Sequence, residues 1–150
     1  MPSELVVCAV HEGGMQFTAT AGEHTVSIDY PMQPGETVAG PTPLQLLLAS
    51  LAACSGSTLA LVLRRMQQPL EALVVHAVGQ RRDEHPTVLT GIDLEFVVTG
   101  TEVDPAAVER ALKIAEEQLC PVWAMLKAGT PITHAFRLTD VATDTEANVG

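Results

Sequence analysis

The alternation of apolar and polar residues near the N-terminus predicts three short strands. The stretches LVVCAV, MQFTAT and HTVSIDY are rich in residues that favour strands, and each is followed by polar residues. Two glycine-containing segments, Glu12-Gly13-Gly14 and Ala21-Gly22-Glu23, separate them and have the composition of hairpin turns. Residues 4–30 therefore predict an antiparallel group of strands.

A long uncharged helix is expected after the proline-rich loop that follows. Residues 44–63 contain no Asp, Glu, Lys or Arg, and Arg64 and Arg65 then occupy the end of the helix, where cations suit the helix dipole. The length would suffice to cross a bilayer. Serine, threonine, glycine and glutamine dilute the run, however, so we interpret it as a core helix and predict no membrane association. A helix that is apolar nearly all round must be covered on all sides, which predicts a partner subunit.

The second half of the chain alternates again. Residues 73–82 and 91–99 predict two strands. A second helix is expected to begin with Asp104 as its N-cap and Pro105 in its first turn. Its apolar residues recur at intervals of three and four: Val108, Ala111, Leu112, Ala115 and Leu119.

This second helix is predicted to break at Cys120, because Pro121 lacks the N–H that a helix interior requires. A new short helix then ends at Gly129, and residues 132–138 supply a last strand. Strands that are grouped in this way predict an α+β fold with antiparallel sheet. The 150 residues predict a single domain, and the polar tail, residues 141–150, is expected to be frayed.

The charge of the chain limits its partners. With 8 basic and 18 acidic residues the net charge is −10, which opposes binding to nucleic acid and to anionic membrane surfaces. The N-terminal residues carry Glu4 in place of the basic residues of a secretory signal, so we expect a cytoplasmic protein.

The three cysteines are the main candidates for chemistry. Cys8, Cys54 and Cys120 have no short spacing, which argues against a disulfide framework and against a zinc site. If the two helices pack side by side, Cys54 and Cys120 could come within disulfide range, roughly 6 Å between Cα atoms. Two buried core cysteines are the alternative interpretation, and the pattern leaves both open.

Local considerations favour ionisation of Cys120 over Cys54. Pro121 could begin a helix whose free N–H groups point toward the Cys120 sulfur, whereas the amides around Cys54 are used within its own helix. Among the five histidines, His134 and His76 share strand faces with apolar residues, so we expect packing roles. No histidine has metal-site spacing with the cysteines, and no metal is predicted.

Three stretches together resemble the OsmC/Ohr family of cysteine peroxidases: GPTPLQLLLASLAACSGSTLALVLRRM, EEQLCPVWAML and PITHAFRL. The similarity runs over about residues 10–138. It implies an α+β fold of antiparallel sheets with two central helices, assembled as an intertwined homodimer with its sites at the subunit interface. Residues 1–43, the N-terminal strands and loop, would be exchanged or packed across that dimer.

The resemblance also implies a reaction. Cys54 would attack an organic hydroperoxide or hydrogen peroxide and become a sulfenic acid, which Cys120 would resolve to a disulfide. An external thiol or small dithiol, such as a lipoyl-type group, would reduce that disulfide. No other cofactor would be needed, and the role would lie in the oxidative stress response.

The sequence departs from the peroxidase members at two positions. They carry an arginine after a Gly-Gly pair and a glutamate before the first-cysteine helix, where this chain has Met15 and Leu44. An apolar pair can replace a salt bridge without stranding a charge, which places the chain in an OsmC-like branch. Met15 and Leu44 would then line a substrate-binding cleft. Two further hypotheses are a binding module for a small apolar ligand and a redox sensor.

Overall fold

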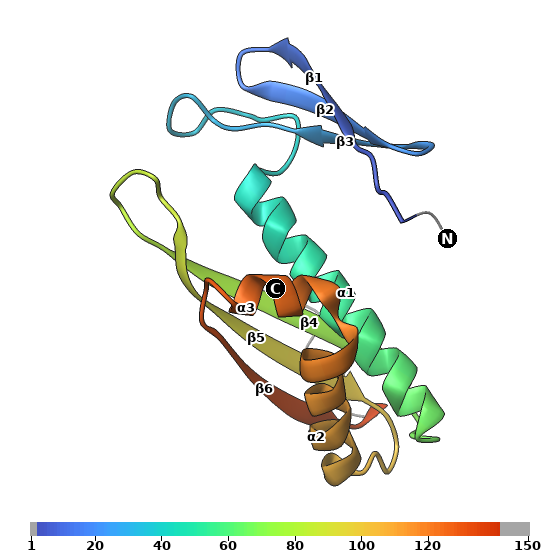
Figure 1. Cartoon of the computed structure of the whole chain (residues 1–150). Helices are drawn as coiled ribbons and strands as arrows, with labels where there is room; N and C mark the ends of the chain where they lie inside the picture. Colours follow the sequence, from blue (N-terminus) through green and yellow to red (C-terminus); the bar gives the residue numbers. More distant parts are fainter. Residues whose placement is uncertain (1–2, 142–150) are drawn as a thin grey trace. The chain divides into compact units, whose positions relative to one another are not determined.

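The computed structural model describes residues 3–141 and divides the chain into two compact units (Figure 1). The N-terminal unit is Met1–Leu47 and the C-terminal unit is Leu48–Gly150. Of the tail predicted to be frayed, all but Val141 lies outside the described residues.

The N-terminal unit is an antiparallel meander of β1 (Cys8–Gly13), β2 (Gln16–Ala21) and β3 (His24–Ile28). The antiparallel prediction is therefore confirmed, but the first strand begins three residues later than predicted. The register of the hairpin explains this. With the turn at Gly14 and Met15, Gly13 pairs with Gln16 and Cys8 pairs with Thr20. Because β2 ends at Ala21, residues 5 and 6 lie beyond the end of the strand that β1 pairs with.

Helix α1 (Pro43–Arg65) begins at a reciprocal cap. The Gln45 amide donates to the Thr42 hydroxyl (3.2 Å), and the Thr42 amide donates to the Gln45 side-chain oxygen (2.9 Å). These bonds satisfy two amides that would otherwise lack partners, and Pro43 needs none. The helix is long and apolar enough to cross a membrane, but Leu51 and Leu59 have no exposed surface. Their burial is that of a core helix, in agreement with our interpretation.

The C-terminal sheet has the strand order β4 (Ala72–Arg81), β5 (Leu89–Thr99), β6 (Ile132–Thr139). Strands β4 and β5 form an antiparallel hairpin, but β6 is parallel to β5. The expectation of a wholly antiparallel sheet is corrected here. Helices between β5 and β6 carry the chain back across the sheet, so the two strands run in the same direction.

That crossover contains three helical pieces: α2 (Pro105–Ile114), a π-helical turn η1 (Ala115–Leu119) and α3 (Pro121–Lys127). Asp104 caps α2 by accepting a hydrogen bond from the Ala106 amide at 3.0 Å, as predicted. In Figure 1 the helices lie against one face of the sheet. Their apolar residues close over the inward face of β5 to form the core: Leu51, Leu59, Leu63, Ile92, Leu94, Phe96, Val98, Val108, Ala111, Leu112, Cys120 and Trp123.

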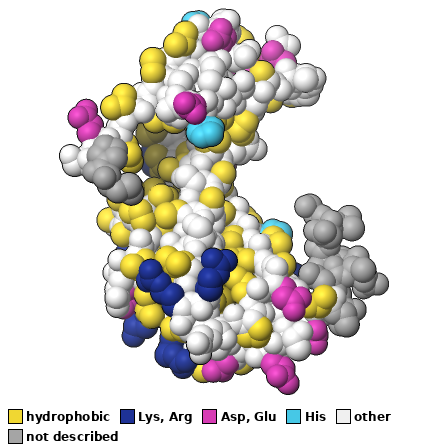
Figure 2. Space-filling view, turned by 90° about the vertical axis from the view of Figure 1, so that its right-hand side faces the viewer, with side chains coloured by type: hydrophobic (Ala, Val, Ile, Leu, Met, Phe, Trp, Pro, Cys, Tyr) yellow, Lys and Arg dark blue, Asp and Glu magenta, His cyan; other side chains and the backbone are white. Residues whose placement is uncertain are grey.

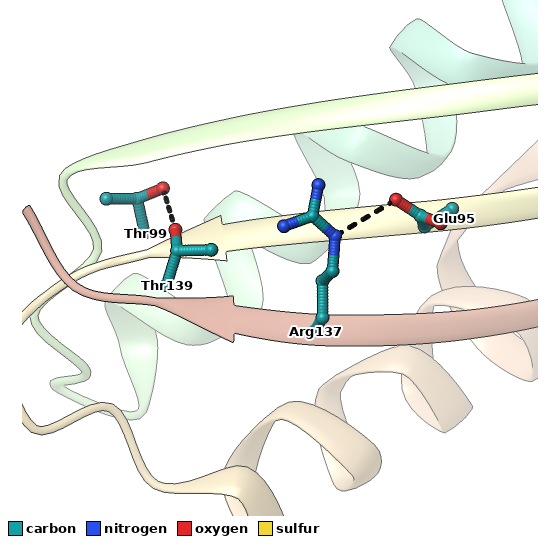
Figure 3. A network of polar contacts seen from close by, with 4 residues as sticks. All are labelled: Glu95, Thr99, Arg137 and Thr139. Atoms are coloured by element: carbon teal, nitrogen blue, oxygen red, sulfur yellow. Dashed lines mark hydrogen bonds and ion pairs between the residues drawn. The ribbon is translucent and has the colours of Figure 1, made fainter. Parts of the chain in front are cut away.

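On the opposite face of the sheet, polar side chains link β5 to β6 (Figure 3). Arg137 forms an ion pair with Glu95 at 3.2 Å, and the hydroxyls of Thr99 and Thr139 are hydrogen-bonded at 2.6 Å. Because the Arg137–Glu95 pair is about half exposed, it contributes little stability. These polar contacts therefore add links between two neighbouring strands, while the apolar core holds the sheet to the helices.

Candidate redox site

Helix α1 places Cys54 at its midpoint, partly exposed and packed against the core. The polar residues that follow it make helix-internal bonds. The Thr58 hydroxyl donates to the Cys54 carbonyl (2.7 Å), and the Ser57 hydroxyl donates to the Ala53 carbonyl (2.7 Å). These hydroxyl groups thus donate their hydrogen bonds to carbonyls of their own helix and need no acceptor from the sheet.

Gly56 explains why the helix can lie so close to the sheet. A Cβ added there would stand 2.9 Å from a methyl group of Val75 on β4, closer than side chains pack. The glycine is therefore required for the close approach of α1 to β4, and this approach fixes the height of Cys54 above the sheet.

The other thiol, Cys120, sits at the junction of two helical pieces. The π-helical turn η1 ends when the Cys120 amide donates to the Ala115 carbonyl at 2.8 Å. Cys120 itself is extended and forms the N-cap of α3, with the Trp123 amide donating to its sulfur at 3.4 Å. The predicted break at Pro121 and the predicted approach of a helix N–H to the sulfur are both confirmed.

The two sulfurs meet. Cys120 Sγ donates a hydrogen bond to Cys54 Sγ at 3.1 Å, and both residues are free thiols. A disulfide needs about 2.05 Å between sulfurs, so a movement of roughly 1 Å would close one. The geometric prediction that packing brings these thiols within disulfide range is therefore confirmed.

Their surroundings differ. Cys120 is 1% exposed, whereas Cys54 is partly exposed. Burial, the larger cause, and the hydrogen bond to Cys54 together raise the pKa of Cys120 from 9.0 to about 11, and the backbone amides of Trp123 and Val122 act against both. The expectation that the helix start makes Cys120 easy to ionise is therefore wrong, because the loss of water outweighs the backbone donors there.

The aromatic surroundings of Cys120 were not anticipated from the sequence. Trp123, the only tryptophan, is fully buried, stacks on Phe96 with ring centroids 6.1 Å apart, and meets the edge of His134 at 5.3 Å. Its position two residues after Pro121, in the first turn of a new helix, was the available signal. His134 is exposed, so it is not a core residue, but its ring contact with Trp123 agrees with the expected packing role.

The remaining candidates lie elsewhere. Met15 is in the β1–β2 turn and half exposed, and Leu44 is in the first turn of α1; both belong to the N-terminal unit. Their substrate-binding role stays a prediction. Cys8 is exposed in β1. Within residues 3–141, no group of three or more His, Cys, Asp or Glu side chains is placed to hold a metal ion.

The acidic residues before Cys120 do not face its sulfur as a pair. Glu116 forms an ion pair with Lys127 of α3 at 3.9 Å, with both side chains partly exposed. Glu117 is exposed. Arg64 and Arg65 are exposed at the end of α1, about 15 Å along the helix from Cys54 at 1.5 Å per residue.

The fold and the thiol pair define an α+β protein with a two-cysteine site between a central helix and a helix start. Comparison with known proteins gives its family. Residues 34–135 match the family model described as OsmC-like protein, and the chain therefore belongs to the OsmC-like family. It is 33% identical to Protein YhfA of Escherichia coli strain K12 over 98 residues, which are 65% of this chain and 73% of that protein.

Solved structures share the fold. A hypothetical protein from Aquifex aeolicus VF5 aligns with a TM-score of 0.82 and 24% identity, covering 93% of this chain and 98% of its own. The OsmC-like protein from Mycoplasma pneumoniae aligns with a TM-score of 0.78 and 21% identity over 94% and 99% of the two chains. The organic hydroperoxide resistance protein OhrB of Bacillus subtilis aligns with a TM-score of 0.61 and 22% identity over 89% and 98%.

Proposed function

We propose that this protein is a cytoplasmic thiol peroxidase that reduces organic hydroperoxides or hydrogen peroxide in the oxidative stress response. The observation that carries the proposal is the hydrogen bond from Cys120 Sγ to Cys54 Sγ at 3.1 Å. Membership of the OsmC-like family and the fold shared with the hydroperoxide resistance protein OhrB support it.

The different environments of the thiols favour distinct roles. Because burial holds the pKa of Cys120 at about 11, Cys120 keeps its proton at neutral pH and can donate it to the neighbouring sulfur. Cys54 is more exposed and receives that hydrogen bond, so it is the sulfur placed to meet a peroxide. We assign Cys54 as the attacking thiol and Cys120 as the resolving thiol.

The cycle then balances without a metal or organic cofactor. The Cys54 thiolate attacks one oxygen of the peroxide, the O–O bond breaks, and the leaving alkoxide takes a proton to become an alcohol. Cys54 is left as a sulfenic acid. The Cys120 sulfur attacks the Cys54 sulfur, its proton departs with the hydroxyl as water, and a disulfide forms. An external dithiol, of which a lipoyl-type group is one example, reduces the disulfide and is itself oxidised.

The test uses a Cys8→Ser background, because Cys8 is an exposed third thiol. Reduced protein is treated with cumene hydroperoxide or tert-butyl hydroperoxide, and its sulfurs are mapped by mass spectrometry. We expect Cys54 sulfenate followed by a Cys54–Cys120 disulfide. If neither species forms under conditions in which the peroxide is stable, the peroxidase assignment is wrong.

We further propose that the protein works as a homodimer in which α1 is covered by a second copy. A groove of about 540 Å³ between α1 and β4 supports this; it is lined mainly by small residues: Ala49, Ala52, Ala53, Gly56, Ser57, Ala60, Leu73 and Val75. Figure 2 shows many hydrophobic side chains at the surface, and every Lys and Arg lies beyond residue 63. The uncharged surface of α1 would cost free energy if water covered it permanently.

Sedimentation velocity tests the dimer. Ala53→Glu places a charge in the groove, and we expect it to shift the protein to monomer. Ala106→Glu, at an exposed position of α2 outside the groove, is the matched control and should leave the dimer intact. A monomeric wild type, or a dimer that tolerates Ala53→Glu, would contradict this assembly.

A further inference from the structure

The two sulfurs of a Cys54–Cys120 disulfide would not be equally open to a reducing thiol. Cys120 is 1% exposed and lies in the core cluster with Trp123. Cys54 is partly exposed on α1 and does not line the groove proposed for the second copy. Since a closing movement of roughly 1 Å is enough to form the bond, this difference should persist in the oxidised protein.

We propose that the external thiol attacks Cys54, and that Cys120 departs as a thiolate received by the backbone amide of Trp123. This assignment rests on the proposed cycle for its biological context, but it concerns only how the disulfide is opened. It gives Trp123 a role in the reaction through its main chain, as a donor to the leaving sulfur.

The step balances as follows. A lone pair of the incoming thiolate forms a new S–S bond to Cys54, and the electron pair of the old bond leaves on the Cys120 sulfur. Water then supplies the proton that returns Cys120 to a thiol. In the second exchange the other thiol of the dithiol attacks its own sulfur in the mixed disulfide, which releases Cys54 and leaves the dithiol oxidised.

Two effects decide which sulfur the external thiol attacks, and they oppose each other: the acidity of the thiol that leaves and the access of the thiol that enters. A leaving thiol whose pKa is raised by up to two units departs up to roughly tenfold more slowly, if leaving groups follow a dependence similar to that of attacking thiols. The raised pKa already includes the opposing effect of the Trp123 amide, which lies 3.4 Å from the sulfur and donates to the departing thiolate. Attack on Cys120 would instead require the incoming thiol to enter a core position with 1% exposure. Access therefore outweighs the electronic preference.

The first test traps the mixed disulfide in Cys8→Ser protein. The disulfide is closed chemically with diamide, which makes the test independent of any reaction with peroxide. The oxidised protein is mixed with 2-mercaptoethanol, quenched in acid at short times and alkylated with N-ethylmaleimide before peptide mapping. We expect the mercaptoethanol adduct on Cys54 to exceed that on Cys120 at least tenfold, with N-ethylmaleimide on Cys120. An adduct that is equally or more abundant on Cys120 would overturn the proposal.

The second test decides the case in which the mixed disulfide recloses too fast to trap. Cys120→Ser and Cys54→Ser, each in the Cys8→Ser background, leave one thiol, which is converted to a mixed disulfide with an aromatic thiol. We expect release by 2-mercaptoethanol to be at least tenfold faster from Cys54 than from Cys120 in the folded proteins and equal in guanidinium chloride. Equal rates in the folded proteins would refute attack at Cys54. A protein that passes these tests but forms no sulfenate with hydroperoxides would keep this opening chemistry while losing the peroxidase function.

Discussion

The buried position of Cys120 predicts a pH dependence for disulfide closure that an ordinary thiol would not show. The perturbation is pH alone, applied to Cys8→Ser protein whose Cys54 has been loaded with an aromatic thiol as a mixed disulfide. Cys120 then attacks Cys54 within the same molecule and expels a coloured thiolate. The rate of this release is first order and reports the ionised fraction of Cys120.

The magnitude follows from the environment of the sulfur. Burial and the neighbouring Cys54 raise the pKa of Cys120 from 9.0 to about 11 in the reduced pair. Loading Cys54 removes its thiol, so the part of the increase that Cys54 causes is lost while the larger part, due to burial, remains. The midpoint of the release rate should therefore lie between 9.0 and about 11.

The sign is that of an acid made weaker by burial, so the reactive thiolate accumulates only as pH rises. From pH 7 to pH 8 the rate should increase about tenfold without levelling, because only a small fraction of Cys120 is ionised there for any pKa between 9.0 and about 11. At pH 7 the rate should be up to roughly 100-fold below that of a thiol with pKa 9.0 in the same geometry.

The assay is stopped-flow absorbance of the released thiolate, with two controls. Cys120→Ser should abolish the release, and the protein unfolded in guanidinium chloride should level off near the ordinary thiol range, with a midpoint of about 8.5. A rate in the folded protein that reaches its plateau at or below pH 8 would show that Cys120 is not held neutral by burial. The division of roles between the thiols would then lose its physical basis.

Two other predictions concern the thiol pair, and a third concerns the glycines that allow close packing of the chain. With hydroperoxide, Cys120→Ser should accumulate Cys54 sulfenic and then sulfinic acid, whereas Cys54→Ser should leave Cys120 unoxidised; mass spectrometry distinguishes the two, and equal oxidation would contradict the roles. Reduced protein should lose about 2 to 3 kcal/mol of stability as pH rises from 9 to 11, since the raised pKa of Cys120 stabilises only the protonated fold, and Cys120→Ser should lack this loss in urea unfolding. Gly56→Ala should cost about 1 to 3 kcal/mol of stability because its Cβ would lie 2.9 Å from a valine methyl group, and Gly100→Ala about 4 kcal/mol or more because its Cβ would lie 2.2 Å from a backbone carbonyl oxygen. Gly129→Ala, whose Cβ would have nothing within 4 Å, should change stability by less than about 0.5 kcal/mol. Equal costs of the three variants in thermal unfolding would refute this ranking.

Much of the fold could be predicted from local pattern. Alternation located the strands of both units, and Asp104 and Pro121 marked the starts of α2 and α3. The direction of β6 could not be predicted in this way, because it depends on how far the crossover carries the chain across the sheet. The start of β1 was also missed, since hairpin register depends on the turn at Gly14 and Met15 rather than on the apolar stretch.

The candidate site shows the same division. The sequence identified Cys54 and Cys120, and also the helix start beside Cys120, because proline after cysteine has a direct local meaning. It could not predict which thiol loses water, since the burial of Cys120 depends on core residues from β5 and α1 that are distant in the sequence. Local reasoning predicted backbone donors at the helix start and missed the larger, non-local effect of desolvation.

This non-local effect bears on the two positions at which the chain departs from the peroxidase members. The resemblance implies that Met15 and Leu44 stand where the peroxidase members carry an arginine and a glutamate, so the chain would lack a cation to stabilise a thiolate but would strand no charge. A neutral donor held against Cys54 could supply part of what the cation supplied, and Cys120 is such a donor because burial keeps its proton in place up to a pKa of about 11. Under this proposal the same proton must leave before Cys120 can attack the Cys54 sulfenic acid. The proton that helps Cys54 attack the peroxide therefore slows formation of the disulfide. Under hydroperoxide, the protein should therefore accumulate Cys54 sulfenic acid at neutral pH and convert it to the disulfide more rapidly as pH rises.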